Sequence, residues 1–211
     1  MYSSTILLAA LIQAVEATLK QHEPEVTALD VAIGDGDHVI NLQRGVAALS
    51  AQADELATLD WRSAFQKIGM TLMSKVGGAS GSLLGTLFVT MGKSLEEGDM
   101  SLSKLSRAFE QGVEAMKARG KSNAGEKTML DVLIPVAQYL QRASEKQCPL
   151  SQVLTEVADV AIAGVESTRD MLATKGRASF LGDRVKGHLD AGAKTSQLVI
   201  CAIAGVLATG A

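Results

Sequence analysis

Apolar residues recur every three or four positions along most of this 211-residue chain. That spacing places their side chains on one face of a helix, so it predicts amphipathic helices. Two short helices are expected, one after Asp37 and one over Leu83–Met91. Asp60 is a suitable N-cap, and Pro135 should kink its helix or lie near its first turn. The clearest stretches are residues 6–19, 60–73, 102–116, 129–142, 150–165 and 194–208.

The chain has no run in which apolar and polar residues alternate, which is the pattern of a half-buried strand. Val199–Ile203 would suit a buried strand, but the alanine- and glycine-rich sequence after it favours a helix. No linker or low-complexity tract divides the chain. We therefore expect a single all-α domain over residues 1–211, made of about eight antiparallel helices.

Glycine-bearing connectors alternate with the long helices. In an up-and-down assembly every second connector lies at the same end, so these connectors are expected to meet at one rim. The connectors concerned are Asp30–Asp37, Gly77–Gly81, Gly120–Thr128 and Gly176–Gly192.

The composition fits a core of closely packed helices, since 47% of the residues are hydrophobic and only 3% are aromatic. A net charge of −3 without a basic segment argues against nucleic-acid binding. Cys148 and Cys201 form no C-x-x-C pair and are expected to be reduced thiols. The apolar stretch Ile6–Ile12 lacks the flanks of a signal peptide, and Leu198–Leu207 is too short to span a bilayer. We therefore expect a cytoplasmic protein without a membrane segment.

Three aspartates, Asp30, Asp35 and Asp37, crowd one short glycine-bearing run. Three neighbouring carboxylates repel one another unless a cation lies between them, and oxygen ligands suit Mg²⁺ or Ca²⁺. An EF-hand is excluded because the spacing is wrong and Asn41 stands at the twelfth position from Asp30. Ordinary helix caps and turns are the alternative. The helix expected after the aspartates favours a metal that is shared with a phosphate.

The run Gly77–Gly81 allows close approach of backbone N–H groups to an anion, and a helix follows it. Tight packing of a turn against a neighbouring helix explains the same glycines, and the residues alone leave both readings open. Arg177 could clamp a phosphate through its guanidinium group. His188 and Asp190 are equally consistent with an exposed turn. The sequence contains no Cys-His pair, no convincing Ser-His-Asp set and no H-E-x-x-H motif.

Two glycine runs come close to the P-loop motif and fail it. Before Gly120 and Lys121 the required earlier glycine is replaced by Ala115, and in the second run Ala193 follows Gly192 where the lysine belongs. Neither run follows a strand, which the P-loop requires. A nucleotide bound by this chain would not use a Walker fold.

Ordered blocks over nearly the whole chain resemble the nucleotide-binding L subunit of bacterial dihydroxyacetone kinases. The blocks are Asp30-x4-Asp35-x-Asp37-His38, Asn41-x2-Arg44-Gly45, Gly69-Met70-Thr71-Leu72, Gly77-Gly78-Ala79-Ser80-Gly81, Gly85-Thr86, Arg119-Gly120-Lys121, Gly125-x-Lys127-Thr128-Met129-x-Asp131 and Lys175-Gly176-Arg177-Ala178-Ser179-x-Leu181-Gly182.

The resemblance implies a barrel of eight antiparallel amphipathic helices with ADP or ATP bound at one end. It implies that Asp30, Asp35 and Asp37 hold Mg²⁺, as a pair of ions. The residues that fall where the family contacts the nucleotide are His38, Asn41, Gly78, Ala79, Ser80, Gly120, Met129, Arg177, Asp190 and Gly192, with Thr86 along the pocket.

Two positions depart from the family pattern. Val39 follows His38 where the family usually has glycine, and Ala191 follows Asp190 where it usually has proline. Loss of the proline would loosen the segment before the last helix. The departures leave the implied metal ligands intact and bear on which ketose is the substrate.

The implied activity is that of a kinase subunit, in which a Mg-bound nucleotide donates its terminal phosphate to dihydroxyacetone or a related ketose such as erythrulose. The ketose is held on a separate K subunit. In versions that depend on the phosphotransferase system, a phosphohistidine M subunit recharges bound ADP. A homodimer, a Mg-ADP-sensing regulatory protein and a helical scaffold without a ligand remain open alternatives.

Overall fold

The computed structural model describes residues 4–95 and 100–209, and these residues form helices and no strand. The helices are α1 (Ser4–Gln21), α2 (Glu23–Ile33), α3 (His38–Ser50), α4 (Ala53–Leu56), α5 (Trp61–Lys75), α6 (Gly78–Ser94), α7 (Leu102–Gly120), α8 (Leu130–Glu145), α9 (Leu150–Ser167) and α10 (Ala191–Thr209), with a 3₁₀ segment η1 (Arg177–Val185). The expected all-α fold is confirmed.

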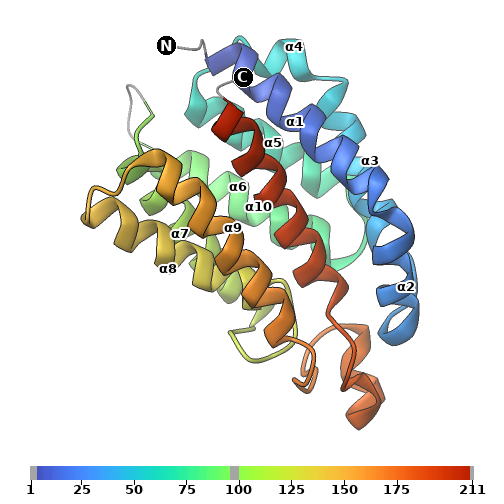
Figure 1. The fold of residues 1–211 in the computed structure, drawn as a ribbon. Coiled ribbons are helices and arrows are strands. Elements are labelled where there is room, and N and C mark those ends of the chain that lie inside the picture. The colour runs from blue at the N-terminus through green and yellow to red at the C-terminus, as the bar shows by residue number, and fades with distance from the viewer. Residues whose placement is uncertain (1–3, 96–99, 210–211) are drawn as a thin grey trace.

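Eight of these helices close into an antiparallel barrel. In the order α1, α3, α5, α6, α7, α8, α9 and α10, each helix packs against the next, and α10 packs back against α1. Figure 1 shows that α2 and η1 lie together at one end of the barrel. The other end carries α4, the first turn of α1 and the last turn of α10. We call the end that carries α2 and η1 the rim. The short helices α2 and α4 lie outside the ring of eight.

Local sequence explains where several helices begin and how closely they pack. The Asp60 carboxylate accepts a hydrogen bond of 2.9 Å from the backbone N–H of Ser63, which is the expected cap of α5. Helices α5 and α6 cross where Gly69 faces Gly85, and a Cβ on Gly69 would lie 2.7 Å from the Gly85 carbonyl oxygen. Pro135 lies inside α8, in its second turn.

Several expected boundaries are wrong, chiefly at the rim. Asp30 lies in the last turn of α2, a helix that the apolar pattern did not predict because Val26 and Ile33 are its only buried residues. The glycine run does not precede α6 but forms its first turn, starting at Gly78. The last helix begins at Ala191, three residues earlier than predicted, because Asp190 caps it.

Helix α10 is longer than its apolar centre suggested. Among the described helices it is the one whose length and composition would allow it to cross a membrane, so the expectation based on the short stretch Leu198–Leu207 does not hold for the helix as formed. Its packing supplies a different argument, since α10 fills the gap between α9 and α1 and closes the barrel. Of the apolar window of α10, 33% is buried in the barrel, and core helices of soluble proteins meet the same length and composition criteria.

The apolar core follows the barrel, and one small cluster lies directly behind the rim. Val26 of α2, Val39 of α3, and Ala191 and Leu198 of α10 form this cluster, and Val26 and Val39 are fully buried. The cluster joins three elements that each carry predicted site residues. The ends of α2, α3 and α10 that carry predicted site residues are thereby packed together at the rim.

Candidate functional site

The rim brings together most of the connectors that the sequence predicted would meet. The His38 ring links α3 to both α10 and α6: its Nε2 lies 2.9 Å from the Thr195 hydroxyl, and its Nδ1 lies 3.4 Å from the Ser80 hydroxyl. Asn41 of α3 contacts Gly77, where a Cβ would lie 2.6 Å from the amide oxygen. Gly192 of α10 lies against Met129 at the head of α8, since a Cβ on Gly192 would lie 3.6 Å from the Met129 backbone nitrogen.

The three aspartates converge at this end. One carboxylate oxygen from each of Asp30, Asp35 and Asp37 lies within 4.8 Å of the others, with Asp30 partly buried and the other two exposed. The Asp30 Oδ2 accepts a hydrogen bond of 3.1 Å from the backbone N–H of His38. Glycine fits closely at position 34, because a Cβ there would overlap the Asp30 Oδ1 and lie 2.8 Å from the Asp30 carbonyl oxygen. We call these three residues the carboxylate cluster.

His38 is partly buried beside the carboxylate cluster. Burial lowers the pKa of its imidazole below the usual value, and the negative charges of Asp30, Asp37 and Asp35 oppose that shift. Both ring nitrogens have hydroxyl partners, on Thr195 and Ser80. A neutral ring that accepts from one hydroxyl and donates to the other fits this arrangement.

Arg177 reaches the carboxylate cluster from η1. Its Nε lies 3.0 Å from the Asp35 Oδ2, and the side chains are 75% and 44% exposed, respectively. The apolar contact of Ala178 and Val185 with Ile33 of α2 holds η1 against the same helix that carries Asp30. Arg177 therefore places a positive charge at the edge of the cluster.

Asp190 has a structural role that is independent of any ligand. Its Oδ2 accepts a hydrogen bond of 2.7 Å from the backbone N–H of Ala193, so it caps α10. Burial raises the pKa of its carboxyl group to about 6, against the lowering effects of the Ala193 N–H and of Lys127. The resemblance implied a nucleotide contact here, and capping of α10 also requires a polar residue at this position.

The remaining predicted residues lie at the rim with one exception. Gly78 and Ala79 are exposed in the first turn of α6, and Gly120 ends α7 against Leu83 of α6. Thr86 lies in the third turn of α6, and its hydroxyl donates to the Ser82 carbonyl at 2.7 Å. No described polar contact joins Thr86 to the carboxylate cluster.

Two buried charged residues were not predicted as site residues. Lys127 lies in the α7–α8 connector, residues 121–129, and Asp131 lies in the first turn of α8. Lys127 is 1% exposed and Asp131 is 3% exposed. The Asp131 carboxylate accepts from the backbone N–H groups of Gly125 at 2.5 Å and Thr128 at 2.8 Å, so it shapes the connector. The sequence did show this lysine and aspartate together in one glycine-bearing block. It could not show that they are buried, because burial depends on how the helices pack.

A model of the DAK2 domain matches residues 32–205 of the chain. This chain belongs to the DAK2 domain family. It is 43% identical over 185 residues to the PEP-dependent dihydroxyacetone kinase 1 ADP-binding subunit DhaL of Listeria innocua, covering 88% of each chain. The corresponding subunit of the Escherichia coli PEP-dependent kinase is 38% identical, over 80% of each chain. Human triokinase/FMN cyclase is 34% identical over 97% of this chain and 36% of the human protein.

A solved structure supports the same placement. The dihydroxyacetone kinase from C. freundii, in complex with AMP-PNP and Mg²⁺, superposes with a TM-score of 0.74 at 28% identity. The match covers all of this chain and 35% of that one, so this DAK2 domain corresponds to about a third of the larger kinase.

The rim of this DAK2 domain fits a hard cation together with an anion. Bonds of about 2.1 Å to Mg²⁺ place opposite ligands about 4.2 Å apart, so small side-chain rotations would bring the cluster's oxygens, now within 4.8 Å, onto one ion. Four helices also begin here, α3, α6, α8 and α10. Their N-termini carry partial positive charge and free N–H groups, which attract phosphate.

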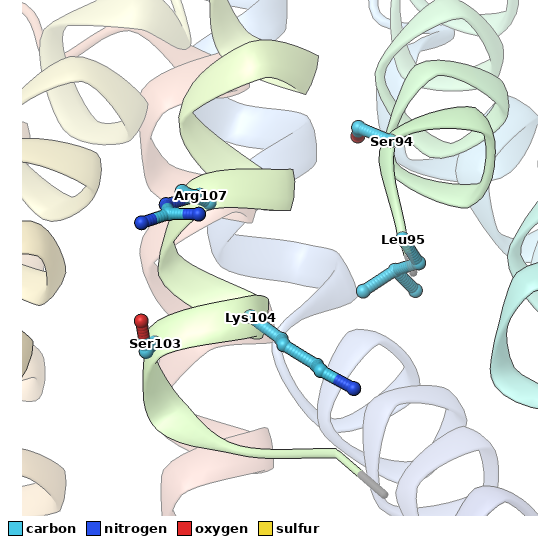
Figure 2. Close-up of a pocket in the computed structure, with 5 residues that line it drawn as sticks. All are labelled: Ser94, Leu95, Ser103, Lys104 and Arg107. Atoms are coloured by element: carbon cyan, nitrogen blue, oxygen red, sulfur yellow. The ribbon is translucent and has the colours of Figure 1, made fainter. Parts of the chain in front are cut away.

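A separate small pocket lies at the α6–α7 junction. It is lined by Ser94 and Leu95 at the end of α6 and by Ser103, Lys104 and Arg107 of α7, which Figure 2 labels. It contains none of the predicted site residues, and it lies where α6 ends, whereas the rim lies where α6 begins. We therefore assign the candidate site to the rim and not to this pocket.

Proposed function

We propose that this DAK2 domain is the nucleotide-binding phosphotransfer subunit of a dihydroxyacetone kinase, or of a kinase for a closely related small ketose. The observation that carries the proposal is the convergence of Asp30, Asp35 and Asp37 beside four helix N-termini. Relatives whose names state an ADP-binding subunit support it along most of the chain. The activity class is phosphoryl transfer to an alcohol group.

In this proposal Asp30, Asp35 and Asp37 hold Mg²⁺, as two ions, and the first turns of α3, α6, α8 and α10 surround ADP or ATP. When bound, Mg²⁺ neutralises charge on the phosphate oxygens as the terminal phosphate leaves. The proposed nucleotide contacts are His38, Asn41, Gly78, Ala79, Ser80, Thr86, Gly120, Met129, Arg177, Asp190 and Gly192.

The chain's own groups bind and orient the phosphates in this scheme. Backbone N–H groups of Ala79 and Ser80 at the start of α6 donate toward the anion, and the Arg177 guanidinium adds a positive charge that can leave Asp35 for a phosphate oxygen. His38 keeps its ring fixed between two hydroxyls, which holds α3 and α6 at a constant separation. These groups are arranged before the ligand arrives, and such preorganisation favours charge stabilisation in the transition state.

The proposal assigns the ketose to a partner. The carboxylate cluster faces outward from the rim, with Asp35 and Asp37 exposed, so a second protein can present an acceptor hydroxyl to the phosphate. That partner is a ketose-binding K subunit. The proposed source of phosphate is either ATP or a phosphohistidine M subunit that recharges bound ADP. The proposed compartment is the cytoplasm, and a homodimer of this chain is compatible with either donor.

One alternative is a Mg-ADP-sensing regulatory protein that docks on a partner without catalysis, because the same site would bind the nucleotide in both cases. A different ketose is the second alternative, and it is favoured by Val39 and Ala191, which differ from the family pattern. Both residues lie in the cluster behind the rim.

The test is a reconstitution with a dihydroxyacetone-binding K subunit, Mg²⁺ and either ATP or a phosphorylated M subunit. We expect phosphorylated ketose to form only when this chain is present, and Asp35→Ala to abolish it while the helical circular dichroism stays unchanged. Mg-nucleotide binding without transfer to dihydroxyacetone or erythrulose would favour the regulatory alternative. Transfer at the wild-type rate by Asp35→Ala would contradict the metal assignment.

A further inference from the structure

The segment that carries Arg177, residues 169–188, leaves the barrel after α9 and returns just before α10. Its two ends are tied together: the Gly187 N–H donates to the Arg169 carbonyl at 2.9 Å, and the Asp190 N–H donates to the Thr168 hydroxyl at 3.0 Å. We call residues 169–188 the Arg177 segment. Because its ends meet, the groups that hold them act on the position of Arg177 together with the apolar contact of η1 with Ile33.

Lys127 of the α7–α8 connector holds both ends of the segment. Its Nζ donates to the Thr168 and His188 carbonyl oxygens at 2.5 Å each and to the Arg169 carbonyl at 3.3 Å. The three N–H groups of an ammonium thus have three backbone acceptors. The Lys127 backbone has a φ of 58°, an uncommon value for a residue with a side chain, and its side chain is fully buried.

Burying an ammonium group is unfavourable unless it is well satisfied, so Lys127 is more than a filler of space. Burial lowers its pKa, while the charges of Asp190 and Asp170 oppose that shift. Its position at the C-terminal end of α9 also favours a cation, because the last carbonyls of a helix have no partner within the helix. Among the described residues it forms no ion pair with a carboxylate.

The neighbouring Glu126 makes a second attachment, nearer to Arg177. Its Oε1 accepts from the Thr174 hydroxyl at 2.6 Å and lies 3.7 Å from the Lys175 ammonium. The Thr174 hydroxyl, the Asn123 N–H and Lys175 contribute to lowering the Glu126 pKa to about 2, so this carboxylate is ionised at neutral pH. Lys127 and Glu126 are consecutive residues of one connector. Lys127 therefore contacts the two ends of the Arg177 segment, and Glu126 contacts the stretch just before Arg177.

We propose that Lys127 and Glu126 are positioning residues for the nucleotide site, because they fasten the Arg177 segment so that Arg177 stays at the carboxylate cluster. The inference rests on the proposed function for its nucleotide arm. The hydrogen bonds of the Lys127 ammonium go to backbone carbonyls of Thr168, Arg169 and His188, and none goes to the carboxylate cluster, so Lys127 acts through backbone position. Its loss lets the segment open more often and lets the bound nucleotide leave faster.

The test compares Lys127→Met, which keeps the length of the side chain and removes the ammonium, with Leu56→Ala. Leu56 is fully buried in α4, at the opposite end of the barrel, so its truncation lowers stability without touching the segment. Glu126→Gln is the second variant and removes a partly exposed charge without changing the size of the side chain, so it keeps the proposal testable should Lys127→Met not fold. The first readout, without nucleotide, is trypsin cleavage after Arg177 and Arg184 in the native protein.

We expect Lys127→Met to speed this cleavage by about tenfold or more and Glu126→Gln to speed it by a smaller factor, because local opening sets native-state proteolysis. Leu56→Ala should be cleaved at the wild-type rate, even if its melting temperature falls as far as that of Lys127→Met. The second readout is the dissociation rate of Mg-ADP, which should rise in Lys127→Met and stay unchanged in Leu56→Ala.

Two failures are distinguishable. A wild-type protein that binds no Mg-ADP overturns the proposed function, and the positioning role falls with it. A wild-type protein that binds Mg-ADP, with variants that match it or match Leu56→Ala in both readouts, overturns only the positioning role. Should Lys127→Met not fold, an unchanged Glu126→Gln would be sufficient to overturn it.

Discussion

Individual residues at the rim serve both structure and the proposed chemistry. Asp30 shows this, since its carboxylate belongs to the cluster, accepts from the His38 N–H and leaves no room for a side chain at position 34. Val39 and Ala191, the two departures from the family pattern, pack in the same buried cluster behind the rim. Their proximity means that the larger residue at 39 and the smaller one at 191 share one space, so they are expected to act as a pair.

Asp190→Asn tests the buried carboxyl group at the head of α10. The pKa of Asp190 is raised from 3.8 to about 6, so its neutral form stabilises the fold below about pH 4 and that stability is lost as the pH rises through about 6. Asparagine caps a helix as well as aspartate does and carries no charge. We expect the melting temperature of Asp190→Asn, relative to the wild type, to rise between pH 4 and 7 in nucleotide-free protein. Asp54→Asn, an exposed control on α4, should show no such trend, and a flat difference for Asp190→Asn would contradict the burial argument.

At the scale of elements, close helix crossings place the N-termini at the rim. Helices α5 and α6 approach so closely at Gly69 and Gly85 that backbone atoms are in contact. Such contact between adjacent helices fixes the position of the first turn of α6, where the Ser80 hydroxyl contacts His38 of α3. The connector of α7 and α8 acts similarly through Asp131, which holds the backbone N–H groups of Gly125 and Thr128.

Gly69→Ala tests the α5–α6 crossing. A Cβ at this position would lie 2.7 Å from the Gly85 carbonyl oxygen and from the Val89 backbone nitrogen, neither of which can move without shifting α6. We expect unfolding free energy to fall by about 1–3 kcal/mol, the usual range for overpacking. Gly205→Ala in α10 is the matched control, because a Cβ there meets nothing within 4 Å and alanine favours helix. Equal stability of the two variants in urea unfolding would contradict the close crossing.

Sequence reasoning reached the carboxylate cluster because Asp30, Asp35 and Asp37 are local in the chain and need only one turn to converge. It reached the rim because connectors alternate with helices in an up-and-down fold. It missed Lys127 for a physical reason: the partners are backbone carbonyls 41 and 61 residues away, at Thr168 and His188, and carbonyls have no residue signature. Helix α2 was missed because so few of its side chains are buried.

At the scale of the whole molecule, the closed barrel collects four helix N-termini and three carboxylates at one end and leaves that end open to a partner. The apolar helix α10 closes the ring, and the connector of α7 and α8 holds the Arg177 segment across part of the rim. Cation, phosphate and acceptor would then meet at one surface, which suits a subunit that presents a nucleotide to another protein. Because the cation is proposed to join the carboxylates to the phosphates, removal of Mg²⁺ should release the nucleotide.

The most direct test is calorimetric titration of ADP into protein freed of resident nucleotide by dialysis against EDTA. With Mg²⁺ we expect binding of about one ADP per chain, and without it a loss of affinity of at least about tenfold, equivalent to about 1.4 kcal/mol. Asp35→Ala should lose binding in Mg²⁺, and Asp54→Ala on α4 should keep it. Unchanged Mg-ADP affinity in Asp35→Ala, or no ADP binding by the wild-type protein in Mg²⁺, would contradict the account.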